Sequence, residues 1–283
     1  MKTTKHIFLL LLCCLALQAS AQVRVHLGAS TAYNSTFVLD EGLSKDPRYS
    51  AQMTYNWAPV GMAFGADFNR GFGLQLESIL SNQGQIYEII DVAKQKIGER
   101  RIDLQYINLP LMLNFLSNSS SRTSFNFMLG PQLSLLTKGQ EIYEQYKNGT
   151  LQTPENGQIP VGATDNGNGT YSYPAGTTVL ASTDAASAIK QFRDKELQLA
   201  AGLGLNIDIG SHLYLSTNIR GNYSFTDMRN EDLINSIRQN SANDVLKDLF
   251  GRRANMLVGA QIGLHYMFGG NRSSVRSLGP LGN

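Results

Sequence analysis

The chain has 283 residues, of which 42% are hydrophobic and 16% charged, and it carries 24 basic against 22 acidic side chains and two cysteines. Both cysteines and two of the lysines fall within residues 1–21, so the chain without this segment is formally neutral and free of thiols. This composition excludes disulfides, thiolate metal sites and thiol nucleophiles. It also argues against a nucleic-acid partner, which needs a concentrated basic surface.

Residues 1–21 are predicted to be a secretory signal peptide. Lys2 and Lys5 supply the charged start, residues 7–17 the apolar segment, and Ala19–Ala21 the small residues before the cleavage site. A lipoprotein signal is the alternative, because two cysteines lie in the apolar segment, but the leucines before them lack the small residues that such a site favours. The apolar segment is too short to cross a bilayer as a helix.

After the signal, stretches in which apolar and polar residues alternate predict eight β-strands. They cover about 22–34, 58–69, 72–84, 101–116, 123–136, 196–209, 212–226 and 254–268. The fourth stretch changes phase, and we expect a bulge near Asn108–Pro110 to restore it. The connections alternate between long and short, and the long ones are about 35–57, 85–100, 137–195 and 227–253. This alternation is typical of an up-and-down barrel with short periplasmic turns and long outer loops.

Alternation alone also fits a soluble antiparallel sandwich, but two features favour a membrane barrel. The polar face is rich in small residues, which suits the narrow lumen of eight strands. Aromatic residues gather at both strand ends, as in two interfacial girdles. They are Phe68, Phe72, Phe115, Phe125, Tyr214, Tyr266 and Phe268 near the short turns, and Tyr33, Trp57, Tyr223 and Phe225 near the long loops. The prediction is an all-β, eight-stranded antiparallel transmembrane barrel over residues 22–268, in the cell outer membrane, with both termini in the periplasm.

Four segments in the predicted strands carry a further pattern: Leu74–Gly84, Leu104–Leu111, Gly130–Ser134 and Arg220–Tyr223. In this order they resemble the PorT-like family of outer-membrane β-barrels, and the resemblance covers nearly the whole mature chain. It implies an eight-stranded barrel, and some members of that family take part in type IX secretion. Two departures weaken the transfer of that role. Loop 137–195 is unusually long for the family, and a tail follows the last aromatic residue, where such barrels commonly stop.

Five charged residues should point into the lumen by their phase in the strands: Glu77, Arg220, Arg24, Asp67 and Asp208. Buried charges need partners, so we expect Glu77 to pair with Arg220, and Arg24 to pair with Asp67 or Asp208. One interpretation makes this network a gate that changes partners and opens a pore. The other, which we favour, makes it a structural plug, because an eight-stranded lumen is normally filled by side chains.

Two histidines, His26 and His265, also face inward and lie on neighbouring strands once the barrel closes. They either share a metal ion or form ordinary hydrogen bonds in the lumen, and we favour the second interpretation because no further ligand is in view. The others are His6 in the signal and His212 in a short turn, so no long loop contains one. His-dependent acyl transfer at the outer rim is therefore not expected. The sequence predicts no enzyme, no cofactor and no bound metal.

Function is expected in the long loops, because rigid scaffolds commonly carry activity there. We expect a non-enzymatic surface or assembly protein that acts chiefly through loop 137–195, with outer-membrane lipid and envelope or secretion-apparatus proteins as partners. The alternative is a narrow, passive, porin-like channel for ions or small solutes. A plug predicts paired Glu77 and Arg220 with no continuous water path, whereas a channel predicts a path past them. Residues 269–283 are rich in Gly, Ser and Arg and are expected to form a disordered periplasmic tail.

Overall fold

The computed structural model describes residues 23–68, 71–117, 122–154, 159–183, 190–240 and 251–268. Within these ranges the chain is mostly β-strand, with one α-helix, α2 (Glu231–Asn240), and one short 3-10 helix, η1 (Leu43–Lys45). None of the helical residues in these ranges forms a helix that is long and apolar enough to cross a membrane. The predicted signal peptide and the predicted tail lie outside the described residues.

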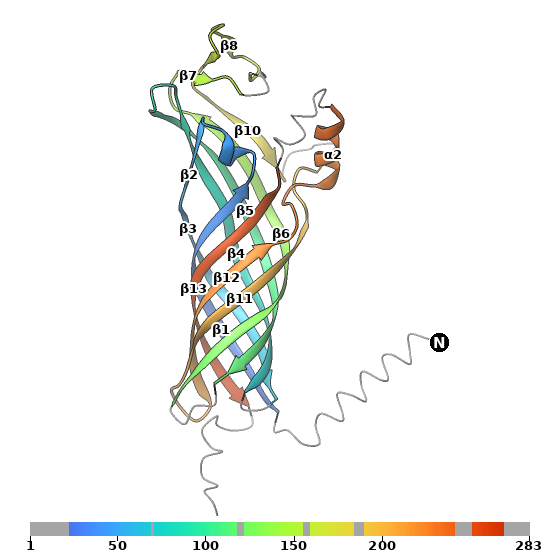
Figure 1. Cartoon of the computed structure of the whole chain (residues 1–283). Helices are drawn as coiled ribbons and strands as arrows, with labels where there is room; N and C mark the ends of the chain where they lie inside the picture. Colours follow the sequence, from blue (N-terminus) through green and yellow to red (C-terminus); the bar gives the residue numbers. More distant parts are fainter. Residues whose placement is uncertain are drawn as a thin grey trace, which may run out of the picture.

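Eight long strands of the described chain form a closed antiparallel ring (Figure 1). In ring order they are β1 (Arg24–Asp40), β3 (Thr54–Asp67), β4 (Phe72–Ile90), β5 (Lys96–Leu116), β6 (Thr123–Gln145), β11 (Lys195–Asp208), β12 (Leu213–Ser224) and β13 (Arg253–Phe268). The ring closes where β13 pairs with β1, from Val25 opposite Phe268 to Asp40 opposite Arg253. Neighbours in the ring follow one another in the sequence, so the predicted eight-stranded up-and-down barrel is confirmed.

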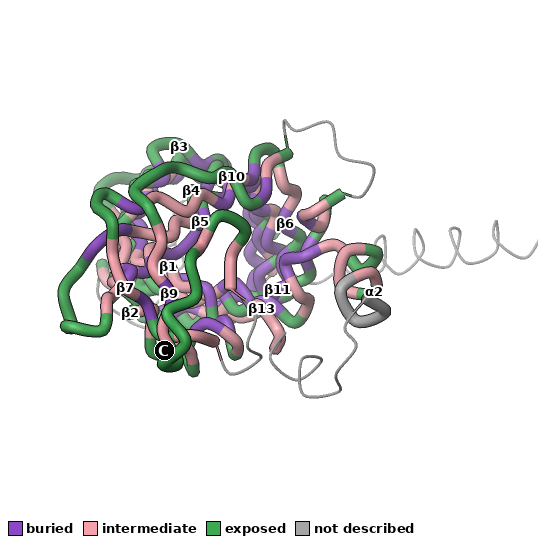
Figure 2. The backbone as a smooth tube through the Cα atoms, turned by 90° about the horizontal axis from the view of Figure 1, so that it is seen from above, coloured by how far each residue is buried: buried purple, intermediate pink, exposed green. Residues whose placement is uncertain are grey.

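The part of the barrel nearest the short turns has polar side chains inside and apolar side chains outside. On β13, His265 is 3% exposed, whereas Leu264 and Tyr266 on either side of it are 49% and 46% exposed. Seen from above, buried and exposed residues alternate along the strands of the wall (Figure 2). This arrangement is the reverse of a soluble β protein, and the apolar outer face is suited to lipid.

Aromatic side chains contact one another at two levels of the outer face. Near the short turns, the ring of Phe72 lies 5.8 Å from the rings of both Phe68 and Phe115, measured between centroids. Nearer the long connections, Tyr33 stacks on Tyr55 with centroids 5.9 Å apart. Two aromatic levels of this kind commonly mark the two interfaces of a membrane.

At the end away from the short turns, the strands run past their predicted ends and form an extension of the barrel. β4 continues to Ile90 and β5 begins at Lys96, so that the predicted loop 85–100 is reduced to the connection 91–95. β6 likewise continues to Gln145, inside the predicted loop 137–195. These loop boundaries were therefore wrong.

The reason is a change in the environment of the strand faces, which is clearest on β5. Leu104 and Tyr106 are buried inside the barrel, whereas Leu111 and Leu113, which have the other parity, are exposed outside. Inward positions keep one parity from Leu104 onward, so the bulge predicted near Asn108–Pro110 is absent from this described strand. Apolar residues face lipid in the lower barrel and face inward in the extension. The alternation of apolar and polar residues along β5 therefore changes parity between the two parts.

Shorter strands complete the extension (Figure 1). β2 (Tyr49–Gln52) pairs with β4, and β10 (Gly176–Ser182) pairs with β6. A separate three-stranded sheet consists of β7 (Gly149–Gln152), β8 (Thr164–Asp165) and β9 (Thr170–Tyr173). Much of the predicted loop 137–195 is thus regular β structure.

Apolar clusters fill the inside of the extension. One cluster is formed by Val38, Leu43, Tyr87, Ile102, Leu104, Tyr106, Ala181, Phe192 and Met228. We call this set the outer apolar cluster. A second cluster, Ile89, Ile97, Leu151 and Tyr171, attaches the three-stranded sheet to β4 and β5. The extension therefore packs in the manner of a soluble β protein, through burial of apolar surface.

Candidate functional site

The centre of the lumen holds an ion pair between Glu77 on β4 and Arg220 on β12. Arg220 Nη1 donates to Glu77 Oε2 at 2.6 Å, and Nη2 donates to Oε1 at 2.7 Å, which makes the pair bidentate. Gln75 and Gln261 also donate to this carboxylate, at 2.7 and 3.2 Å. Glu77 is 2% exposed and Arg220 is 5% exposed. This is the pairing that the strand phases indicate.

The two residues of this pair lie on opposite walls of the barrel. Reading round the ring from β4, the strands are β5, β6, β11 and then β12, so the two partners stand on opposite walls. Bidentate arginine–carboxylate pairs fix geometry as well as charge. The pair therefore bridges the full width of the lumen at the level of the membrane-facing wall.

The other three predicted charges lie closer to the short turns. Arg24 and Asp67 occupy directly opposite positions on β1 and β3, and both are buried. Asp67 also approaches His26, with 3.9 Å between Oδ1 and Nε2. Asp208 is at the end of β11, half-buried and opposite Tyr214 of β12. The structure thus brings Arg24 next to Asp67 and places Asp208 at the barrel rim, apart from the central pair.

The two inward histidines meet below the ion pair. The rings of His26 and His265 are 5.5 Å apart between centroids, and Tyr214 stacks on His265 at 4.5 Å. The Tyr214 hydroxyl lies 3.0 Å from His26 Nδ1, and Ser216 Oγ lies 2.9 Å from His265 Nε2. Tyr214 was predicted to belong to the aromatic girdle; this is wrong, because its neighbour Leu213 is the residue that faces outward.

A buried carboxylate that the sequence analysis did not single out lies above the central pair. Glu196 is fully buried and accepts hydrogen bonds from the Tyr106 hydroxyl and from Asn255 Nδ2, the latter at 2.8 and 3.0 Å to its two oxygens. Gln198 donates to Glu196 as well, at 3.3 Å. The phase of β11 assigns Glu196 to the inner face, so the sequence alone would have been sufficient to predict its position in the lumen.

A second missed group is an ion cluster inside the extension. Glu141 contacts Arg100 Nη2 at 2.5 Å and Arg253 Nη1 at 3.0 Å, and Arg253 also contacts Asp40 at 2.5 Å. Glu141 and Arg100 fall in segments that were expected to be loops, so strand phase was never applied to them. The cluster ties β1, β5, β6 and β13 together at one level.

Little empty space remains beside the central pair. A cavity of about 20 Å³ lies next to Arg220 and is lined by Ser81, Asn108, Asn222 and Gln261, among others. Such a volume holds about one water molecule. The buried oxygens of Ser81 and Asn108 have no protein partner, which suits an internal water at this place.

Within the described residues, no three or more His, Cys, Asp or Glu side chains are grouped as a metal site would require.

The connection after β12 is held by Asp227. Its carboxylate accepts hydrogen bonds from the backbone and side chain of Arg229 and from the backbone N–H of Arg253. Burial raises the pKa of Asp227, but the hydrogen bonds and charge of Arg229 outweigh this and hold the pKa below its usual range. A carboxyl group with a lowered folded pKa stabilises the fold above its unfolded pKa of about 3.9, and this contribution is lost as the pH falls through the folded value.

We therefore expect the amide protons of Arg229 and Arg253 to lose protection when the pH is lowered from 7 to below about 4. Asp227→Asn should show the reduced protection already at pH 7. Hydrogen exchange of the protein in nanodiscs, corrected for intrinsic rates, measures this, with Asp165→Asn on the exposed strand β8 as control. Equal protection in the wild type and Asp227→Asn at pH 7 would contradict the assignment.

A closed antiparallel ring with a filled polar interior, an apolar outer face and two aromatic levels is the structure of a bacterial outer-membrane β-barrel. Residues 18–230 match the family model described as "Outer membrane protein beta-barrel domain", and the chain belongs to this family. The predicted barrel class and the predicted location in the outer membrane are thereby confirmed. Membership of the PorT-like group within such barrels stays a prediction.

Solved structures of outer-membrane proteins are similar to this chain at low sequence identity. Ail, the attachment invasion locus protein of Yersinia pestis, solved in complex with a heparin analogue, is 12% identical with a TM-score of 0.36, over 86% of this chain and 99% of Ail. OprG from Pseudomonas aeruginosa is 12% identical with a TM-score of 0.38, over 88% and 96%. The protease OmpT from Escherichia coli is 10% identical with a TM-score of 0.36, over 87% and 96%. No curated protein matches the sequence. The family match carries the assignment, and these similarities add no argument about activity.

Proposed function

We propose that this protein is a non-enzymatic, non-conducting scaffold of the outer membrane, whose extension binds another protein of the cell envelope. The filled lumen is the observation that supports this proposal most. The Glu77–Arg220 pair bridges the barrel at the centre, and the outer apolar cluster occupies the interior above it. A passage blocked at two levels is a poor channel, whereas the extension offers a large folded surface.

The proposed topology places residues 1–21 as a cleaved signal, both ends of the barrel in the periplasm, and residues 269–283 as a periplasmic tail. The support is the asymmetry of the connections, since bacterial barrels have short turns on the periplasmic side and long connections outside. The extension, with its three-stranded sheet, then faces the exterior.

Two observations favour a role without catalysis. The histidines of the described chain, His26, His212 and His265, all lie at the end of the barrel with the short turns. The segments that resemble the PorT-like family point to work within a protein assembly, such as a secretion apparatus. We therefore propose that the partner is an envelope protein and that the barrel serves as its anchor.

We expect the refolded protein to give no conductance steps in a planar bilayer, and Glu77→Gln to be equally silent, because neutralising one carboxylate does not empty the lumen. Glu88→Gln, in the extension, is the matched control. Heat-dependent mobility in detergent gels must first show that each sample is folded. Reproducible steps that change with Glu77→Gln would overturn the proposal and favour the narrow channel.

The scaffold role itself is tested by photo-crosslinking in intact cells. Val161, which is 99% exposed beside the three-stranded sheet, carries the crosslinker, and Ile209, at a short turn, is the control position. We expect one discrete protein adduct from Val161 and none of the same mass from Ile209. Cleavage near Val161 by protease added to intact cells checks its side of the membrane. The absence of any adduct from folded, externally accessible protein would contradict the scaffold.

A further inference from the structure

The barrel wall separates locally between β3 and β4. These strands pair from Asp67 opposite Gly73 up to Gly61 opposite Ile79, and no further. The wall is joined again higher up, where β2 pairs with β4 from Gln52 opposite Ile86. Between these points, residues 53–60 and 80–85, all of them described, share no ladder pairing. The wall has a lateral split at this level.

A glycine of β4, Gly84, lies at the floor of the split. Gly84 has φ +145°, a conformation that L side chains rarely adopt, and a Cβ there would lie 1.9 Å from the carbonyl oxygen of Ile102. Residue 84 therefore adds no side chain to the split, and the hydroxyls of Thr36 and Thr54 donate to its carbonyl oxygen. On the other side, Pro59 has no N–H with which to pair.

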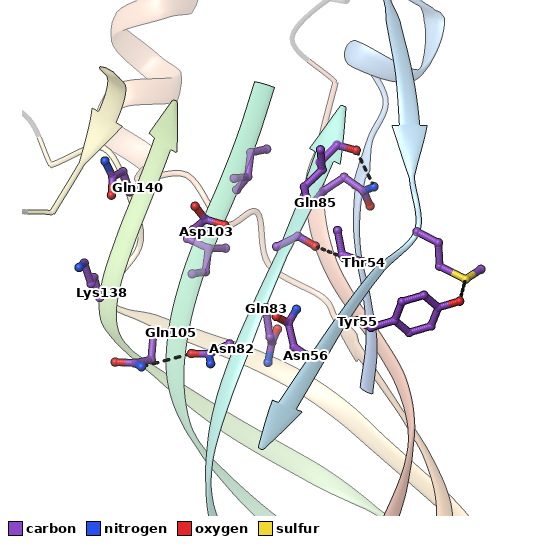
Figure 3. A pocket seen from close by; sticks show the side chains of 15 residues that line it. Thr54, Tyr55, Asn56, Asn82, Gln83, Gln85, Asp103, Gln105, Lys138 and Gln140 are labelled. Atoms are coloured by element: carbon purple, nitrogen blue, oxygen red, sulfur yellow. Dashed lines mark hydrogen bonds between the residues drawn. The ribbon is translucent and has the colours of Figure 1, made fainter. Parts of the chain in front are cut away.

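A groove of about 550 Å³ occupies the split and continues over the outer face of β5 and β6 (Figure 3). This volume is in the range of sites for small organic ligands. Six amide side chains line it: Asn56, Asn82, Gln83, Gln85, Gln105 and Gln140. The charged residues of the lining are Asp103 and Lys138, which have opposite signs.

This lining has a definite chemical preference. An amide offers both donors and an acceptor, as a hydroxyl group does, so a set of amides matches a ligand that carries many hydroxyls. An anionic headgroup would instead require several unopposed cationic side chains. The groove therefore suits an uncharged polyhydroxylated molecule.

One amide in the groove is left without a partner inside the protein. Gln83 is 4% exposed and its Nε2 is buried without a hydrogen bond. Its neighbours are engaged: Gln85 donates to the carbonyls of Gln52 and Ile86, and Gln105 donates to Asn82 at 3.2 Å. Buried donors are normally satisfied, so an unpartnered one facing a groove indicates an acceptor that arrives with a ligand. Figure 3 shows Gln83 beside Asn56 in the split.

The groove begins at the upper aromatic level of the barrel. Tyr55 lines it and is 57% exposed, and Trp57, two residues further along β3, is 63% exposed. Exposed tyrosine and tryptophan of membrane proteins sit at the headgroup region. A ligand in the groove is thus placed where lipid headgroups lie.

We infer that the groove between β3 and β4 is a binding site for an uncharged saccharide, either the sugar headgroup of a membrane glycolipid or a free oligosaccharide. The site stands independently of the scaffold role, because it depends only on the groove and its lining. Gln83 and Asn56 would bind sugar hydroxyls in the split, and Gln105 and Asn82 would bind them on the outer face.

The chain contains a built-in reporter, because Trp57 is its single tryptophan and follows Asn56 directly. The full mature protein is refolded into nanodiscs of phosphatidylcholine, with and without digalactosyldiacylglycerol, and Trp57 fluorescence is recorded. Free digalactosylglycerol and inorganic phosphate are titrated into the glycolipid-free nanodiscs. We expect a saturable fluorescence change with the sugar and none with phosphate. A response to the glycolipid alone identifies lipid as the source, and a response to the free headgroup as well identifies a soluble saccharide site.

Variants distinguish sugar binding in the groove from sugar binding at the membrane surface. Gln83→Met and Gln105→Ala should each weaken sugar binding about three- to tenfold, the loss expected for one or two hydrogen bonds. Gln152→Met, on the exposed face of β7 and outside the groove, should leave binding unchanged. Gln105→Ala alters a partly exposed side chain and so tests the site even if Gln83→Met folds poorly. No saturable response to either sugar form, an equal response to phosphate, or unchanged binding in Gln105→Ala would overturn the inference.

Discussion

Replacing Glu77 by leucine should destabilise the barrel by about 3–5 kcal/mol, because it leaves the Arg220 guanidinium buried across the lumen without its counter-ion. The loss is large because Glu77 also accepts hydrogen bonds from Gln75 and Gln261, whose donors lose their acceptor at the same time. Urea unfolding in phospholipid vesicles, followed by Trp57 fluorescence, measures the effect as a lower midpoint with an unchanged slope.

The double variant Glu77→Leu with Arg220→Met distinguishes a lost ion pair from lost packing. Removing both charges leaves no uncompensated ion, so most of the stability should return. Glu88→Leu, which removes a half-exposed carboxylate from the same strand, is the control and should change stability by less than about 1 kcal/mol. If the single variant is as stable as the wild type, the pair does not hold the opposite walls together.

Replacing Glu141 by leucine should open the extension while leaving the lower barrel intact. Arg100 and Arg253 both contact this carboxylate, so its removal leaves Arg100 without its counter-ion and leaves Arg253 with Asp40 alone, at a local cost of about 3–5 kcal/mol. Because the cluster lies beyond the upper aromatic level, the cost falls on the strands of the extension. Local opening rather than global unfolding is expected.

Hydrogen exchange resolves this local effect. Amides of 96–104 and 139–145 should exchange faster in Glu141→Leu, whereas amides of 199–205 in the lower wall should not change. Glu144→Leu, which lies on the same strand outside the cluster, is the matched control. Uniform acceleration along the whole barrel would show that the extension and the barrel unfold as one unit, contrary to this prediction.

Strand phase was sufficient for the lower barrel and for its central pair. There the outward residues are apolar and the inward ones polar, so parity assigned Glu77 and Arg220 to the lumen, and the need of buried charges for partners predicted their pairing. Parity failed in the extension, because Leu104 and Tyr106 turn inward where Leu111 and Leu113 turn outward. The inverted pattern resembles that of a loop or a bulge. Glu141 and Arg100 were therefore assigned to loops, and their ion pair was not predicted.

The groove between β3 and β4 was beyond the reach of sequence reasoning for a different reason. It depends on two strands separating between Gly61 and Gln52, which is set by pairing register over many residues. Gly84 and Pro59 are visible in the sequence as residues that disturb a strand. Neither residue alone predicts which neighbouring strand separates from β4, or over how many residues.

The seam between β1 and β13 has a consequence for biogenesis. A chain delivered from its N-terminus presents β1 first, but the partner that completes β1 is the last strand to arrive. Until then β1 has an open edge that invites pairing with other chains. Closure joins residues separated by nearly the whole chain, which makes it slow and dependent on full-length synthesis. A chain cut short before residue 253 lacks β13, so it cannot close the ring and keeps an unpaired edge on β1.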